Sequence, residues 1–227
     1  MPLYFIILLA SCVVPILFSI FGIDFIKNWK SFTISTSIIA VIFLVWDAFF
    51  TAQGIWGFTD EYCLGIYFLK MPIEEWMFFY IIPFCSLFAH FALFYAYPNL
   101  KLSPKITRYI SIILIGMALT LIVAYYPKAY TVVNFSFLFI TITLGIIFKI
   151  ELLQRFYISF LIILIPFFIV NGILTGLITD IPVVWYDNSE NLGVRLITIP
   201  VEDIGYAFTM LFGNLMIFDS LNKKQNI

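Results

Sequence analysis

Residues 64–75 read LGIYFLKMPIEE, and residues 192–203 read LGVRLITIPVED. Both stretches have Leu-Gly, six further residues, a proline, one apolar residue and two acids, and the copies lie 128 residues apart. Each copy opens a long apolar segment. An ionised side chain in hydrocarbon costs roughly 2.5 kcal/mol or more. Two acidic pairs at one register, in a chain with few charges, therefore predict a duplicated active site.

The composition is that of a membrane protein. Apolar residues make up 63% of the chain and charged residues 11%, whereas a soluble domain has roughly half and a quarter. A net charge of −1 gives no indication of nucleic acid binding. The three cysteines have no metal-binding or redox spacing, so we predict neither a metal site nor a disulfide. No basic leader or small-residue cleavage site precedes the first apolar stretch, so we expect no cleaved signal peptide.

Seven apolar stretches approach the ~20 residues that a helix needs to cross the hydrocarbon. The sequence therefore predicts an all-α polytopic membrane protein with seven transmembrane helices. The predicted spans cover residues 3–22, 33–54, 73–97, 108–126, 130–148, 156–178 and 201–219.

An internal repeat relates the first three predicted spans to the last three. A shift of 124 to 128 residues lays one set over the other, and it places Asp47 near Asn171. We expect a 3+1+3 arrangement, with one repeat in residues 1–97, a connector helix in 98–129 and the second repeat in 130–227. Four crossings separate equivalent helices, so the repeats should be parallel and both acidic motifs should lie in the same leaflet.

The distribution of Lys and Arg predicts the orientation of the chain in the membrane. The side of the amino terminus holds three basic residues and the opposite side holds nine. We therefore expect an integral protein of a bacterial cytoplasmic membrane, with the carboxyl terminus in the cytoplasm and the amino terminus outside. The three are Lys70, Lys128 and Arg195, and the nine are Lys27, Lys30, Lys101, Lys105, Arg108, Lys149, Arg155, Lys223 and Lys224.

Two interpretations of the acidic pairs are open. A proline followed by acids is typical of a helix start, where carboxylates meet the unpaired N–H groups and the positive end of the dipole. Alternatively, a carboxyl group in an apolar site resists ionising and can donate a proton at neutral pH, while a second acid accepts one. Neighbours on a helix point ~100° apart, so one acid of each pair can face a cavity while the other contacts an adjoining helix.

Other residues are candidates for lining such a cavity. Asp47 lies inside the second predicted span, and an intramembrane carboxylate is a functional candidate by default, although it could also bond another helix. Aromatic residues make up 20% of the chain, and ring faces stabilise cations by ~2 kcal/mol in dry sites. Arg195 is placed to pair with Glu202 or Asp203. The cavity candidates are Asp47, Asn171, Trp46, Phe78, Tyr206 and Arg195, whereas His90, Asn134 and Asn214 are predicted to form interhelical hydrogen bonds.

At these motifs the chain resembles the membrane-embedded, non-flavin carotenoid cyclases of the lycopene cyclase domain family. The mark of that family is Pro-x-Glu-Glu or Pro-x-Glu-Asp at the start of a membrane helix, here at residues 72–75 and 200–203. Trp46-Asp47, residues 54–58 (GIWGF) and residues 171–176 (NGILTG) are similar as well. The resemblance covers most of both halves without the connector, and it is to the fused form that holds both repeats.

The resemblance implies a redox-neutral cyclisation, an intramolecular lyase or isomerase reaction, that converts lycopene or a related acyclic carotenoid to β-carotene through γ-carotene. One acid protonates the terminal double bond, the next alkene attacks the tertiary cation and closes a six-membered ring, and a base removes a neighbouring proton. No cofactor is implied, and the Gly-x-Gly-x-x-Gly motif of flavin-dependent cyclases is absent from the sequence. Membrane lipid and the carotenoid are the implied partners.

The family motif carries over to Glu74, Glu75, Glu202 and Asp203 as catalytic residues. We expect Glu74 and Glu202 to matter most, because they occupy the position that both copies share as Glu. The sequence leaves open which acid donates the proton, whether β, ε or γ rings form, whether C40 or C50 carotenoids are used, whether one or both ends react, and the oligomeric state.

Three other classes compete with this interpretation. An opsin needs a lysine in its last helix, and residues 201–219 contain none. A membrane prenyltransferase needs clustered Asp residues to bind a magnesium pyrophosphate, and no predicted helix has two at that spacing. A proton-coupled transporter suits parallel repeats with intramembrane acids, yet Pro83 and Pro166 do not occupy the equivalent positions that broken transport helices would predict.

Overall fold

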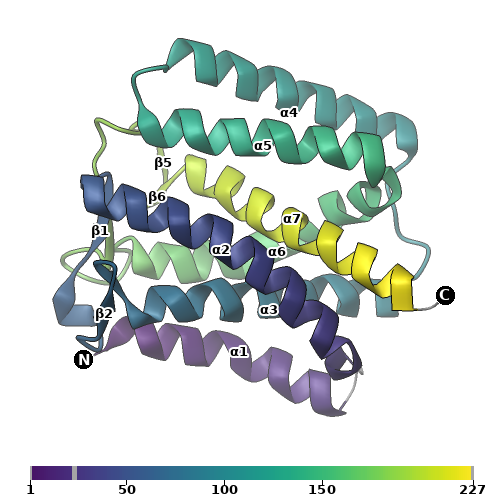
Figure 1. Cartoon of the computed structure of the whole chain (residues 1–227), viewed down its shortest axis with the longest axis horizontal. Helices are drawn as coiled ribbons and strands as arrows, with labels where there is room; N and C mark the ends of the chain where they lie inside the picture. The colour runs from purple at the N-terminus through teal and green to yellow at the C-terminus, as the bar shows by residue number, and fades with distance from the viewer. Residues whose placement is uncertain (1, 22–24, 226–227) are drawn as a thin grey trace.

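Seven helices form a bundle in the computed structural model, which describes residues 2–21 and 25–225, with side chains for 2–19 and 27–222. Figure 1 shows α4 and α5 along one edge of the bundle, α1 along the opposite edge, and the other four helices between them. The side chains of Lys223 and Lys224, and all of Asp24, lie outside the described residues. The helices are α1 (Leu3–Phe21), α2 (Trp29–Gln53), α3 (Ile73–Ala96), α4 (Pro104–Ala124), α5 (Ala129–Phe148), α6 (Ile150–Leu174) and α7 (Glu202–Gln225).

Helices α2 to α7 are long and apolar enough to cross a membrane, so the chain is an all-α polytopic membrane protein. The apolar part of α1 in the described residues, Leu3–Ser19, is shorter. Six of the seven predicted spans are thus confirmed as capable of crossing, and the seventh stays a prediction.

The predicted boundaries of four spans were wrong by four residues or more. Helix α2 begins at Trp29 rather than 33, and helix α7 ends at Gln225 rather than 219. Helix α4 begins at Pro104 rather than 108, because proline fits the first turn and Ser103 Oγ accepts a hydrogen bond from Ile106 N at 3.2 Å. Helix α6 begins at Ile150 rather than 156 and ends at Leu174 rather than 178. The charged residues at these boundaries, such as Lys30, Lys105 and Arg155, lie in the helix ends rather than in loops.

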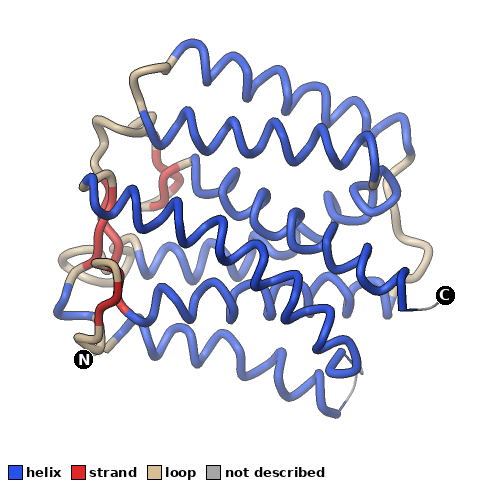
Figure 2. The backbone as a smooth tube through the Cα atoms, viewed as in Figure 1, coloured by secondary structure: helices blue, strands red, loops and turns tan. Residues whose placement is uncertain are grey.

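Short strands, which the sequence does not predict, organise the two long loops. Strands β2 (Tyr67–Phe68) and β3 (Met71–Pro72) form a hairpin before α3, and β5 (Arg195–Leu196) and β6 (Ile199–Pro200) form the matching hairpin before α7. Two short 3-10 helices, Phe25–Asn28 and Asp60–Tyr62, complete the described elements. Figure 2 shows the strands gathered at the end of the bundle that also holds the amino terminus.

The remaining two strands join the halves of the chain. Strand β1 (Trp56–Phe58) pairs antiparallel with β4 (Val184–Tyr186), and Gly57 lies opposite Trp185. Those two residues are themselves 128 apart, which is the shift that relates the two acidic motifs. A two-fold axis between the halves would pair each strand antiparallel with its equivalent and place Gly57 opposite Trp185. The observed register of β1 and β4 is the one that such an axis produces.

Helix packing follows the same relation. Helix α1 packs on α3 as α5 packs on α7, and α2 packs on α7 as α6 packs on α3. Helix α4 lies on α5 and also touches α6. The predicted interhelical hydrogen bonds are confirmed at His90 with Ser159 (2.7 Å), at Asn134 Nδ2 with the Glu202 carbonyl (2.7 Å) and at Asn214 Nδ2 with Thr36 Oγ1 (2.9 Å).

We expect Gly145→Ala to destabilise the bundle. A Cβ at Gly145 of α5 would lie 2.6 Å from Phe212 of α7, whose side chain is fully buried and cannot move aside. Overpacking of this kind costs about 1–3 kcal/mol. Thermal unfolding of the purified protein in detergent measures the effect. Gly116→Ala in α4 is the matched control, because its Cβ meets nothing within 4 Å, and a lowered unfolding temperature for that variant alone would contradict the packing argument.

Candidate active site

The first acid of each motif binds the backbone of its own hairpin. Glu74 Oε1 accepts a hydrogen bond from Leu64 N at 2.6 Å, and Glu202 Oε1 accepts one from Leu192 N at 2.7 Å. Both carboxyl side chains are fully buried. The Leu-Gly pair and the first acid are therefore two ends of one structural unit, repeated in both halves.

A glycine follows each of these leucines for a conformational reason. Gly65 has a φ of 80° and Gly193 a φ of 70°, which is the left-handed region that side chains disfavour. This turn places the leucine N–H near the start of the next helix, where the carboxylate accepts its hydrogen bond.

The second acid of each motif turns toward the interior and meets a tyrosine. Tyr4 of α1 donates to Glu75 Oε2 at 2.5 Å, and Tyr130 of α5 donates to Asp203 Oδ1 at 2.5 Å. Tyr186 of β4 donates to the other Asp203 oxygen at 3.0 Å. The two halves thus hold their second acid in the same way, with an added donor on Asp203.

Asp47 of α2 is the third carboxyl group of the site. Its Oδ1 accepts hydrogen bonds from the Trp56 indole and, at 3.4 Å, from Thr51. Asp47 and Glu75 line the same cavity, and the second oxygen of Asp47 is buried there without a hydrogen-bond partner among the described residues. Two acids on the wall of one apolar cavity cannot both be ionised without a large cost, because burial and like charge both oppose it.

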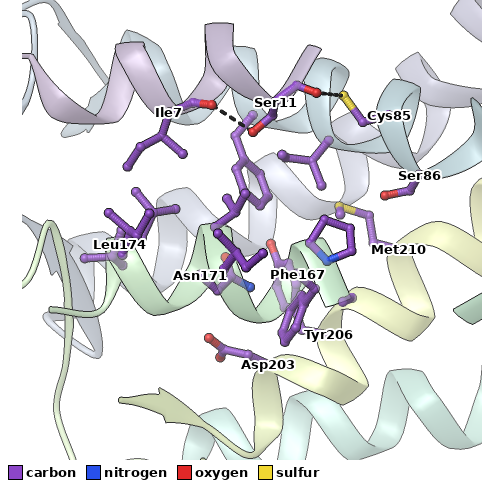
Figure 3. Close-up of a pocket in the computed structure, with 18 of the residues that line it drawn as sticks. Ile7, Ser11, Cys85, Ser86, Phe167, Asn171, Leu174, Asp203, Tyr206 and Met210 are labelled. Atoms are coloured by element: carbon purple, nitrogen blue, oxygen red, sulfur yellow. Dashed lines mark hydrogen bonds between the residues drawn. The ribbon is translucent and has the colours of Figure 1, made fainter. Parts of the chain in front are cut away.

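All three of these carboxyl groups line one cavity of about 580 Å³, within the range of ligand sites. Figure 3 shows Ile7 and Ser11 of α1 on one side of it and Asp203 and Tyr206 of α7 on the other. Apart from these acids, the walls are mostly aliphatic and aromatic, and the described lining includes no Lys or Arg. The cavity therefore suits a hydrocarbon ligand, and the protein contributes three acid groups to its walls.

The cavity separates the predicted site residues into two groups. Six of them line it: Glu75, Asp203, Asp47, Asn171, Phe78 and Tyr206. Glu74 and Glu202 do not line it, because they are turned to the hairpins. Trp46 does not line it either and packs in the core, where it stacks on Phe137 with centroids 5.2 Å apart.

The predicted pairing of Arg195 with Glu202 or Asp203 is wrong. Its guanidinium donates to the Thr198 carbonyl at 2.6 Å and to Asn188 Oδ1 at 2.9 Å, and it lies over the Tyr186 ring at 5.7 Å. Arg195 sits in β5 beside the hairpin turn, which directs its side chain to neighbouring loop groups. Arg195 does not line the main cavity and instead lines a second, smaller pocket of about 250 Å³.

Sequence reasoning missed four polar aromatic residues that contact the acids. Tyr4 and Tyr130 could have been found, because the repeat shift lays one span over the other and places both near the start of equivalent helices. Trp56 lies in residues 54–58, which are part of the family resemblance, whereas Tyr186 lies in a loop strand with no such signal. Burial and the neighbouring Asp203 raise the pKa of Tyr186 well above its usual value, so its hydroxyl stays a donor. Among the described residues, no three His, Cys, Asp or Glu side chains are grouped as metal ligands.

Comparison with known families finds a match to lycopene cyclase over residues 2–93 and 127–221. The chain belongs to the lycopene cyclase family. Membership makes it a carotenoid cyclase in general terms, acting on a carotenoid in a membrane. The match has two parts, one for each acidic motif, and it omits the segment that contains the whole of α4. Comparison with curated proteins and with solved structures gives no match.

We expect Glu74→Ala and Glu202→Ala to lower stability, because each leaves a backbone N–H without its acceptor, at a cost of about 1–3 kcal/mol. The loss should be larger for Glu202, which also accepts from Thr131 Oγ1 at 2.8 Å. Thermal unfolding in detergent measures both. Glu61→Ala removes an exposed acid from the same loop as Leu64 and should change stability by no more than about 0.5 kcal/mol. Equal effects in all three variants would contradict the assignment.

Proposed function

We propose that the chain is a lycopene β-cyclase, which closes the acyclic ends of lycopene to give β-carotene through γ-carotene. The observation that carries the proposal is one apolar cavity lined by carboxyl groups from both repeats, Glu75 with Asp47 from the first and Asp203 from the second. Acid–base cyclisation of a polyene needs a proton donor and a proton acceptor that face the same hydrocarbon, and this cavity supplies both.

The Asp47–Glu75 pair is our candidate for the proton donor. A carboxyl pair in a dry site retains one proton, and that proton is available to the terminal alkene of the substrate. Protonation of one alkene carbon leaves a tertiary cation, and the electron pair of the next alkene forms the ring bond. Phe78, Tyr206 and Trp56 present aromatic rings to the same cavity, where they would stabilise the cation.

Asp203 is our candidate for the base. Both of its oxygens accept a tyrosine hydrogen bond, and such bonds favour the carboxylate form. It would take the proton next to the ring cation, whose C–H electrons become the ring double bond. One proton enters the substrate and one leaves it, so each ring closure is neutral overall, and the proton on Asp203 must return to the acid pair before the next.

We also propose the finer architecture that goes with this function. Seven spans would form two parallel three-helix repeats, in residues 1–97 and 130–227, around a connector in 98–129. The β1–β4 register and the matching helix contacts support it. With the amino terminus outside and the carboxyl terminus in the cytoplasm, as the distribution of Lys and Arg favours, the carboxyl groups would lie near the outer face.

Glu75→Gln and Asp203→Asn should each abolish ring formation, with a loss of about 10²-fold or more, because each removes an acid or a base. Expression in a bacterium that accumulates lycopene, followed by chromatography, measures the products and also identifies the ring type. Glu74→Gln and Glu202→Gln are the matched controls. Each keeps an oxygen that can accept the leucine N–H, so ring formation should stay within about tenfold of the original chain. Full activity in both Glu75→Gln and Asp203→Asn would reject the proposal.

We expect a monocyclic carotenoid to precede the bicyclic product. The cavity is lined by a single set of these three acids, so one end of the substrate would be processed before the other. A time course by chromatography should show γ-carotene rising first and β-carotene following with a lag. If β-carotene appears at low conversion without a lag and without a monocyclic intermediate, the two ends do not react one at a time.

A further inference from the structure

The cavity reaches the outer surface of the bundle between α1 and α6. Four of its lining residues are exposed: Ala10 and Val14 of α1, and Pro166 and Ile169 of α6. Val14 and Ile169 are each 58% exposed. All four are apolar, so the opening lies in a surface suited to hydrocarbon rather than to water.

The position of the opening along the helices agrees with this. At 1.5 Å per residue, Ala10 and Val14 lie about 10 and 16 Å from the start of α1, and Ile169 lies about 8 Å from the end of α6. Those helix ends are on the side of the acidic motifs and the hairpins. The opening is therefore below the loops, at a depth that belongs to the hydrocarbon of a bilayer.

The equivalent seam in the other half is closed by two aromatic rings. Helices α2 and α5 correspond to α6 and α1, and between them Trp46 and Phe137 stack with their planes 15° apart. The shift that lays Asp47 over Asn171 places Trp46 on Val170. The shift that lays Tyr4 over Tyr130 places Phe137 on Ser11.

Val170 and Ser11 therefore stand where the other half has a stacked pair, and both of them line the cavity. Their side chains are far smaller than an indole and a phenyl ring. The two seams therefore differ in side-chain size at these two positions. Large rings fill the α2–α5 seam, and the smaller Val170 and Ser11 leave space at the α1–α6 seam. Pro15 and Pro166, which lie inside α1 and α6, also line the cavity at this seam.

We propose that the α1–α6 seam is the lateral opening through which one end of a linear polyene enters from the lipid, while the rest of the molecule stays in the hydrocarbon. The proposal rests on the proposed function and adds the route of the substrate to it. A polyene dissolved in the bilayer meets this apolar opening directly, and its leading end then reaches the Asp47–Glu75 pair and Asp203 without crossing water.

Bulky substitutions at the seam test the route. Ala10→Trp and Ile169→Trp should lower the initial rate of ring formation roughly tenfold or more, through kcat/KM rather than through the amount of protein. Val13→Trp and Ile165→Trp are the matched controls on the same two helices. These residues are 51% and 64% exposed but do not line the cavity, and their variants should stay within about twofold.

A labelling experiment tests the route without relying on activity. In a chain whose Cys12, Cys63 and Cys85 are replaced by Ala, Ala10→Cys and Val13→Cys should both react with a lipid-soluble maleimide in liposomes. Added lycopene should slow labelling at position 10 and leave position 13 unchanged. Equal rates at position 10 with and without lycopene, or original rates of ring formation in both Ala10→Trp and Ile169→Trp, would overturn the lateral route.

The two proposals fail in different ways. If the original chain makes rings but the seam variants do so equally well, the lateral route is wrong and the cyclase assignment stands. If the original chain makes no rings in a lycopene-accumulating host, the proposed function itself is wrong. Protection of position 10 by lycopene in such a chain would still support the seam as a polyene-binding site.

Discussion

The rest of the structure depends on a hydrogen bond between a buried carboxylate and a backbone N–H ten residues earlier in the chain. It occurs twice, at Glu74 with Leu64 and at Glu202 with Leu192. A buried N–H without an acceptor is costly, so this bond fixes the hairpin over the start of the helix. Once the first acid is held there, the next residue must point about 100° away. In both halves that direction leads into the cavity.

This division explains why the motif needs two acids in succession. The helix-start interpretation describes the first acid of each pair, and the catalytic interpretation describes the second. The first acid organises the loop, as helix-start residues do, and the second faces the substrate cavity beside a tyrosine hydroxyl. The expectation that Glu74 and Glu202 matter most for chemistry stays a prediction, and in the structure both of them contact the loop backbone.

The halves are alike in backbone and unlike in side chains. Their equivalent strands pair around Gly57 and Trp185, and their equivalent helices make matching contacts. Within that frame, one middle helix has Asp47 where the other has Asn171, and one seam has Trp46 and Phe137 where the other has smaller residues. The first change gives the cavity an acid pair on one side and a single acid on the other. The second makes the cavity open on one side of the bundle.

The membrane class, the duplication and most of the helices follow from apolar length and a repeated motif, which are local properties that need no knowledge of packing. Asp47, Asn171, Phe78 and Tyr206 were also predicted to line the cavity, and all four do so. Tertiary structure alone decided which acid of each pair reaches the cavity, because the orientation depends on a hairpin whose strands are two residues long. It also decided that Trp56 and Tyr186 join the site from the loops and that Arg195 bonds to loop groups, because these contacts arise only where distant segments meet.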